Sequence, residues 1–214
     1  MNRKTLIFSF LLLLSASMAK AEKIRDFFIS EPGNVFEMLT QGTRSAMITM
    51  AEQGDTIESE TQLDGTSKIL VLEDEYMKVQ NSASKTTELR MLTKGKADTV
   101  IVVVETVKLP VLDSQISFYD SHWQPLKADK VMKGGIPTLK DFVPSSTAKK
   151  DTEKALKEVD MQMISMAFEG ESHSKLVVKQ QLKNFYSKED YKKYGFLLNQ
   201  LTYEIKNTKL VLVK

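Results

Sequence analysis

The chain has no cysteine among its 214 residues. This absence excludes disulfide bonds, thiolate chemistry, cysteine-ligated metals and any lipid anchor attached through sulfur. The fold must therefore be stabilised by its hydrophobic interior, and a chain of this length can bury one core or two small ones.

The chain also lacks an excess of charge of one sign. It carries 30 basic and 28 acidic residues, and three of the basic ones lie in the first 21 positions, which leaves 27 against 28. Like charges are not grouped, since Lys192-Lys193 comes shortly after Glu189-Asp190. This pattern argues against a nucleic-acid-binding surface and against a polybasic membrane patch.

Sequence motifs of common enzymes are missing as well. There is no G-x-S-x-G, G-x-G-x-x-G, H-E-x-x-H or Walker sequence. The two histidines, His122 and His173, stand in polar, turn-like surroundings. A glycosidase pair among the carboxylates has no sequence signature, and no pair is indicated here. We therefore assign no catalytic residue and expect no cofactor.

The first 21 residues have the pattern of a secretory signal peptide. Asn2-Arg3-Lys4 is basic, Leu6–Leu14 is apolar but too short to span a bilayer, and Ala19-Lys20-Ala21 is a small-x-small cleavage site. We expect cleavage before Glu22 and export to the periplasm or cell surface, without a transmembrane span. An uncleaved anchor is the alternative.

The clearest structural signal is the run Val100–Val104. Its five residues are all β-branched and apolar, which predicts a central strand covered on both faces. Leu109-Pro110-Val111 then predicts a turn. Leu112, Ile116 and Phe118 follow at even spacing, so a second strand can return antiparallel to the first.

The remaining patterns predict an α+β fold with a mostly antiparallel sheet built from two strand-rich halves. The first half is a meander over residues 66–123, because its connections are too short for parallel crossovers. The second half contains a hairpin of Val159–Phe168 with Lys175–Leu182, followed by strands near 201–205 and 210–213.

Helices are expected at both ends of the mature chain. Ser30-Glu31-Pro32 predicts a helix start, with Val35, Phe36 and Leu39 at helical spacing. A second helix is expected from Thr43 to Gly54, with Ala46, Met47, Met50 and Ala51 on one stripe, and a third from Ser187 over Tyr191, Tyr194 and Leu198. These helices are expected to cover one face of the sheet.

We expect residues 22–214 to form a single α+β domain. The alternative is two subdomains, 22–125 and 157–214, joined by the loop-rich connection 126–156, where Gly134-Gly135, Pro137 and Pro144 interrupt the apolar pattern.

The candidate contact residues are Tyr119, Asp120, His122 and Trp123. Tyr119 and Trp123 share the odd-numbered face, where they could contact sugars, peptides or proteins, or pack under a helix. Asp120 and His122, with Asp113, could hold a metal. In the alternative interpretation, which we favour, Asp120 and Ser121 cap a turn, His122 is solvated and no metal site exists.

The methionines allow a second functional hypothesis. They could line an adaptable cavity for a lipid-like ligand or simply fill gaps in the core. The residues concerned are Met38, Met47, Met50, Met161, Met163 and Met166.

The segment Asp113–Trp123, DSQISFYDSHW, resembles a family of uncharacterised exported proteins from Gram-negative gut bacteria, a domain of unknown function. Further matches are Leu63-Asp64-Gly65 with Leu70 and Leu72, Glu75-Tyr76, and Leu201-Thr202-Tyr203. The helix expected within 34–54 departs from the acidic, proline-bearing version of the family. The resemblance implies export and one α+β unit, and it brings no activity or site residues.

Taken together, the sequence predicts an exported, non-catalytic binding or interaction protein whose partner is an unknown protein or glycan. The alternative is a carrier of an apolar ligand. A hydrolase of cell-wall or glycan material is the third hypothesis.

Overall fold

The structure is a computed structural model that describes residues 22–213, apart from 56–57, 63–64, 96–97, 109 and 160. The signal peptide expected at residues 1–21, and Leu63-Asp64 of the family resemblance, therefore lie outside the described residues. Within the described part, no helix is both long and apolar enough to cross a membrane.

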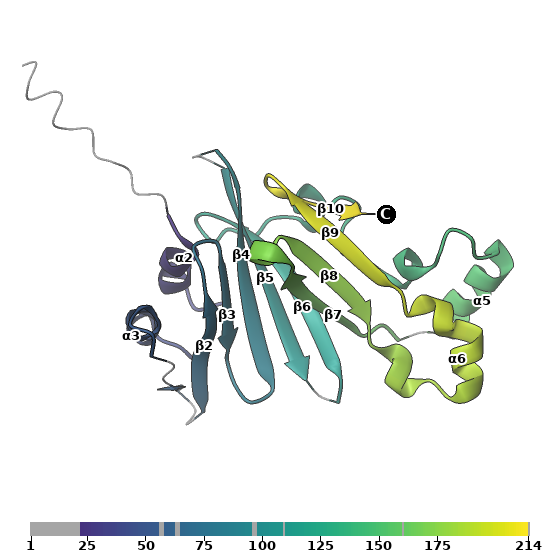
Figure 1. Cartoon of the computed structure of the whole chain (residues 1–214), viewed down its shortest axis with the longest axis horizontal. Coiled ribbons are helices and arrows are strands. Elements are labelled where there is room, and N and C mark those ends of the chain that lie inside the picture. Colours follow the sequence, from purple (N-terminus) through teal and green to yellow (C-terminus); the bar gives the residue numbers. More distant parts are fainter. Residues whose placement is uncertain are drawn as a thin grey trace, which may run out of the picture.

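Two antiparallel sheets form the frame (Figure 1). The larger sheet has six strands in sequence order, each paired with the next. They are β1 (Ser59–Glu60), β2 (Thr66–Leu72), β3 (Tyr76–Gln80), β4 (Lys85–Lys94), β5 (Asp98–Lys108) and β6 (Leu112–Asp120). The smaller sheet has the order β10-β9-β8-β7. Its strands are β7 (Ile164–Glu169), β8 (Lys175–Gln180), β9 (Gln200–Lys206) and β10 (Lys209–Val213).

Short helices precede the large sheet, occupy the long connection between the sheets and lie in the connections of the small sheet. The α-helices are α2 (Ile24–Ser30), α3 (Gln41–Glu52), α4 (Ala128–Val131), α5 (Lys149–Glu158) and α6 (Lys188–Tyr194). The 3-10 turns are η1 (Leu139–Phe142), η2 (Glu171–His173), η3 (Leu182–Phe185) and η4 (Gly195–Leu197). The predicted α+β class with antiparallel sheets is confirmed.

Strand β5 is the buried central strand that the Val100–Val104 run predicts. It pairs with β4 on one side and β6 on the other, and all five residues of the run are buried. Their side chains alternate between two cores, because successive residues of a strand point to opposite faces. Val100, Val102 and Val104 enter one core, whereas Ile101 and Val103 enter the other.

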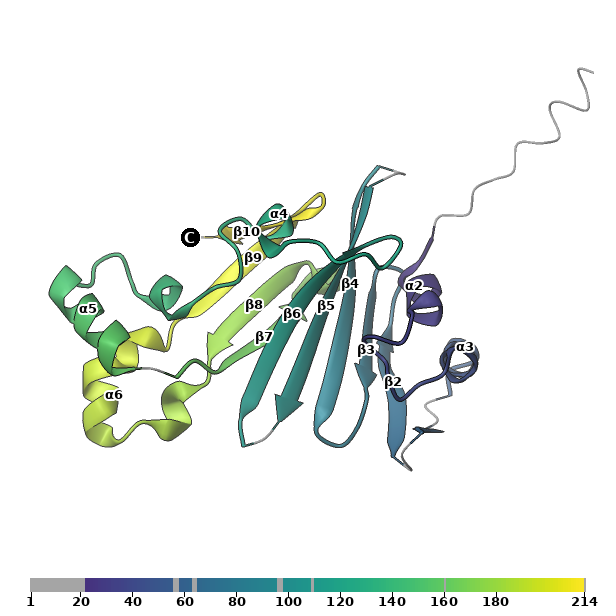
Figure 2. The same cartoon turned by 180° about the vertical axis from the view of Figure 1, so that it is seen from behind.

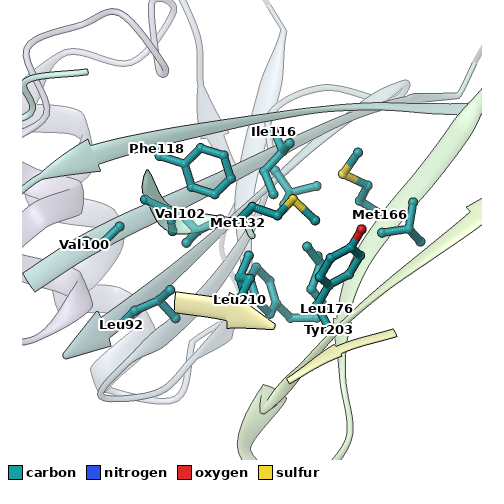
Figure 3. Packing of buried hydrophobic residues seen from close by; sticks show 14 of the residues in the cluster. Leu92, Val100, Val102, Ile116, Phe118, Met132, Met166, Leu176, Tyr203 and Leu210 are labelled. Atoms are coloured by element: carbon teal, nitrogen blue, oxygen red, sulfur yellow. The ribbon is translucent and has the colours of Figure 1, made fainter. Parts of the chain in front are cut away.

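The two faces of the large sheet are covered by different elements. Helices α2 and α3 lie against one face (Figure 2) and form a core with odd-numbered side chains of β5. The small sheet covers part of the other face, and its side chains Met166, Leu176 and Tyr203 meet Val102 and Phe118 in a common core (Figure 3). The two strand-rich halves of the sequence thus share one apolar cluster.

The prediction of a helix over Val35, Phe36 and Leu39 is wrong. Those side chains are buried, but residues 31–40 form an irregular loop between α2 and α3. The physical reason is the Glu31 carboxylate, which is buried inside this loop. It accepts the backbone N–H groups of Gly33 (2.9 Å), Asn34 (2.7 Å), Val35 (2.9 Å) and Phe36 (3.4 Å).

Arg44 holds the other side of this loop. Its guanidinium is only 3% exposed, lies 3.7 Å from Glu31 and donates to the carbonyls of Leu39 (2.6 Å), Ile29 (3.3 Å) and Glu31. Burial lowers the pKa of Arg44, and the charge of Glu31 partly offsets this effect. A buried ion pair therefore fixes a segment that forms no regular helix or strand.

Helix α3 differs from its prediction in detail. It begins after Thr40, whose hydroxyl accepts the Thr43 N–H, and it ends before Gly54, which has the left-handed backbone (φ +84°) expected of a residue that terminates a helix. The buried stripe is Arg44, Met47 and Ile48, whereas Ala46 is exposed.

Helix α6 begins after Ser187 as predicted, and it packs beside α5 at the far end of the small sheet (Figure 1). Strand β7 begins at Ile164 rather than Val159, and Asp160 lies outside the described residues. A third apolar cluster, in addition to the two cores on either side of β5, anchors α5 and α6. Its buried residues are Leu139, Ala155, Leu182, Tyr194 and Leu197.

Candidate functional site

The chain reverses direction immediately after β6, and Asp120 organises this turn. Its Oδ1 accepts the backbone N–H groups of His122 (2.8 Å) and Gln124 (2.9 Å), and its own N–H donates to the Gln124 carbonyl at 3.0 Å. The returning chain then runs beside β6, where the Leu126 N–H donates to the Phe118 carbonyl at 2.8 Å. Asp120 therefore caps a tight turn.

Trp123 is the most unusual residue of this turn. It is 7% exposed, and its backbone adopts a left-handed conformation (φ +58°) that is an outlier for a bulky residue. Its indole N–H is buried without a hydrogen-bond partner among the described residues. The strain and the unpaired donor each cost about 1–3 kcal/mol. Because two destabilising features occur at one residue, Trp123 is a candidate functional position.

Tyr119 and Trp123 are brought together as the sequence predicts, with ring centroids 5.3 Å apart at an angle of 56°. Tyr119 is half-buried and packs against the core beneath α2 and α3, to which Trp123 belongs. His122 is exposed on the outer side of the turn, and its Nδ1 lies 3.3 Å from the Ser121 hydroxyl. The outer surface of the turn is thus formed by His122, Gln124 and part of Tyr119.

No group of three or more metal-ligating side chains occurs among the described residues. Asp120, His122 and Asp113 do not form one, because Asp120 binds backbone N–H groups and Asp113 accepts the N–H of Ile164 at 3.3 Å.

We expect Trp123→Phe to change the free energy of unfolding by less than about 1 kcal/mol, because it removes the unpaired N–H while keeping most of the ring. Trp123→Ala is expected to cost about 3–5 kcal/mol, as for other large-to-small changes in a core. Urea unfolding measures both. Equal losses in the two variants would contradict the assignment of the indole N–H as unpaired.

Trp123 is the only tryptophan of the chain, so the fluorescence of the protein reports on this site alone. We expect blue-shifted emission that is protected from soluble quenchers.

A second polar constellation, which the sequence did not reveal, joins the two sheets. Alternate N–H groups on one edge of β7 donate to side chains of the large sheet instead of to a neighbouring strand. The pairs are Ile164 with Asp113 Oδ1 (3.3 Å), Met166 with Ser114 Oγ (2.9 Å) and Phe168 with Glu88 Oε2 (2.9 Å). These side chains protect the edge of β7 and fix its position across the large sheet.

The β7–β8 turn adds a further contact at the same junction. The His173 ring stacks on Tyr76 with centroids 3.6 Å apart, and its Nδ1 lies 3.2 Å from Glu73 Oε2. The His173 carbonyl accepts the Nε–H of Arg90 at 3.2 Å. Ser172 and His173 both have positive φ, near +50°, so this turn is held in a strained shape by what it contacts.

Glu88 is the most buried carboxylate of this junction, at 3% exposed. Besides Phe168 N–H it pairs with Lys78 Nζ at 3.0 Å. Burial, followed by the charge and hydrogen bond of Glu88, raises the pKa of Tyr76. The register places Lys78 opposite Glu88 and Tyr76 opposite Arg90.

We expect Glu88→Ala to lower the free energy of unfolding by about 2–4 kcal/mol, because it leaves the Phe168 N–H and the Tyr76 hydroxyl without an acceptor. Glu105→Ala is the matched control: Glu105 is a glutamate on the adjacent strand β5 and forms a partly exposed pair with Lys85 at 2.6 Å. Such pairs contribute about 0–1 kcal/mol. Similar small losses in both variants would contradict a role for Glu88 in joining the sheets.

Four hollows on the described surface have volumes of about 210–360 Å³. Sites for small molecules span about 300–1,000 Å³, so these lie at or below the lower end. The methionines do not gather around one of them. Met47 and Met166 are buried in different cores, Met38 and Met161 line different hollows, and Met50 and Met163 are half-buried.

The family model described as "Protein of unknown function (DUF3256)" matches residues 16–210. The chain belongs to this family. The expected resemblance to an uncharacterised family is therefore confirmed, while export and an origin in Gram-negative gut bacteria stay predictions.

The DUF3256 chain is also similar to a solved structure, described as "Structure of a domain of an uncharacterized protein from Porphyromonas gingivalis W83". The sequences are 24% identical, the match covers 90% of this chain and 98% of the other, and the TM-score is 0.74. This likeness shows a shared fold. No curated protein matches the chain.

Proposed function

We propose that this DUF3256 protein is an exported, non-catalytic binding protein of the periplasm or cell surface, and that it contacts a protein or glycan partner through the turn Tyr119–Gln124. The observation that carries the proposal is Trp123, which keeps a left-handed backbone and an unpaired indole N–H at a rigid turn. Backbone strain of this kind persists where a site must hold a particular shape.

The turn has the features of a preorganised contact surface. Asp120 fixes its backbone, Trp123 anchors it in the core beneath α2 and α3, and the side chains of His122 and Gln124 are exposed. Rigid contact residues bind with little loss of conformational entropy. An aromatic ring at such a surface, here Tyr119, provides area for a sugar or a peptide.

The non-catalytic part of the proposal is supported by how the other polar groups are used. His173, Arg90 and Glu88 are engaged with the β7–β8 hairpin, and Glu31 and Arg44 with the loop 31–40. Each of these groups has a structural partner. We do not extend the proposal to a ligand carrier, because the methionines are spread over separate cores and hollows.

Export is supported by the signal-like sequence of residues 1–21. The test is mass spectrometry of the native protein after osmotic-shock fractionation of the cells. We expect a chain that starts at Glu22 in the periplasmic or surface fraction. A cytoplasmic chain that retains residues 1–21 would contradict export.

The contact site is tested by immobilising the purified chain and recovering its partner from native envelope material. We expect His122→Glu combined with Gln124→Glu to reduce recovery at least tenfold, since both side chains lie on the outer surface of the turn. Lys133→Glu, at another exposed turn, is the control and should leave recovery unchanged. Equal recovery by all three proteins would show that the partner binds elsewhere.

A further inference from the structure

The outer side of η3 and α6 exposes two large aromatic side chains. Phe185 is 43% exposed and Tyr191 is 51% exposed, although both residues belong to a segment that packs on an apolar cluster. Tyr194 and Leu197 anchor the segment in that cluster.

Lysines flank these aromatic residues along the sequence. The segment 183–193 contains four lysines, and all four are exposed. We call the exposed set the α6 surface; it consists of Lys183, Phe185, Lys188, Tyr191, Lys192 and Lys193.

The two acidic residues of the segment, Glu189 and Asp190, reduce this charge only in part. Asp190 is half-buried, and its carboxylate accepts the Ser187 hydroxyl at 2.8 Å to close the start of α6. Glu189 is exposed. The four lysines and the two acidic residues give this segment a net charge of +2. All four lysines are exposed, whereas only one of the two acidic residues is. Along the sequence, the adjacency of Glu189-Asp190 and Lys192-Lys193 conceals this separation.

We propose that the α6 surface binds peripherally to membranes that contain anionic phospholipids. Exposed aromatic rings among lysines match the bilayer interface, where rings leave water and ammonium groups meet lipid phosphates. Phe185 favours a lipid surface over an acidic protein or glycan, because its ring carries no polar group and gains most from leaving water. The surface is distinct from the Tyr119–Gln124 turn, so this proposal does not rest on the proposed function.

The size of the effect follows from the charge. Each lysine near an anionic bilayer contributes about fivefold to the binding constant, which converts from about 1 kcal/mol. Four lysines and two partly inserted rings therefore predict reversible binding that weakens as salt is added, because the attraction between exposed charges is screened.

The test is co-sedimentation of the chain beginning at Glu22 with vesicles, since the apolar residues 6–14 would bind lipid by themselves. We expect binding to vesicles of phosphatidylethanolamine with phosphatidylglycerol and little binding to pure phosphatidylcholine. Replacing the four lysines of the α6 surface by glutamine should weaken binding at least 30-fold. Phe185→Ser with Tyr191→Ser should weaken it at least fivefold.

The matched control replaces four exposed lysines elsewhere by glutamine, at Lys94, Lys108, Lys133 and Lys206. It removes the same net charge and should change binding less than threefold. Circular dichroism and thermal melting establish that each variant is folded.

Three results would overturn the proposal. The first is no binding of the folded wild-type chain to the anionic vesicles at low salt. The second is an equal loss in the control and in the α6-surface variant. The third is binding of soluble acidic proteins or polysaccharides, but not of vesicles, which would make an acidic macromolecule the partner of this surface.

Discussion

Replacing Val104 with Asp will prevent the chain from folding. Val104 is fully buried in the middle of β5, and the register places it directly opposite Glu88. A carboxylate at position 104 would be buried without a positive partner of its own and would lie next to the buried carboxylate of Glu88. We expect the resulting loss in the free energy of unfolding to exceed roughly 4–5 kcal/mol, the size that marks an exceptional single-residue effect. We expect an insoluble product, or a soluble one that lacks cooperative unfolding.

Val107→Asp is the control for this prediction. Val107 lies on the same strand, is 42% exposed and faces Lys85 in the register. A carboxylate at this position stays in water, so we expect a change of less than about 1 kcal/mol in the free energy of unfolding. Circular dichroism and urea unfolding compare the two variants. Normal folding of both would show that β5 is not covered on the side that Val104 faces.

The second large effect is expected for Arg44→Leu. It leaves the Glu31 carboxylate buried without its cation and the carbonyls of Leu39, Ile29 and Glu31 without their donor. Breaking a buried pair by removing one partner costs about 3–5 kcal/mol. Urea unfolding should show this loss, together with faster amide exchange in residues 31–40.

Arg25→Leu serves as the control, because Arg25 pairs with Glu52 at the surface between α2 and α3. Such surface pairs contribute about 0–1 kcal/mol. If Arg44→Leu costs no more than Arg25→Leu, the loop 31–40 is not held by the buried pair.

The sheets could be predicted from the sequence because their signals are local. The β-branched run Val100–Val104 and the even spacing of Ile116 and Phe118 are visible within a few residues, and short connections require antiparallel pairing. The loop 31–40 could not be predicted in this way. Glu31 and Arg44 are 13 residues apart, and their pairing replaces the helix that the spacing of Val35, Phe36 and Leu39 indicates.

The candidate site was partly predictable for the same reason. The capping role of Asp120 depends on residues within four positions of it, so a turn was a clear expectation at this point. No local sequence signal indicates the left-handed backbone of Trp123. The core in which Trp123 is buried is formed by residues that are distant from it in the sequence. The junction of His173 with Glu73 joins residues 100 positions apart, and only the folded chain brings them together.

The most direct test of the proposed function is photo-crosslinking in the native cells. A photoreactive amino acid is placed at His122, on the outer surface of the Tyr119–Gln124 turn, or at Ser146, an exposed turn residue elsewhere. We predict a discrete crosslinked product from position 122, in the periplasmic or surface fraction, that is absent from position 146. The same products from both positions, or none from position 122 while the protein is present in that fraction, would contradict the account.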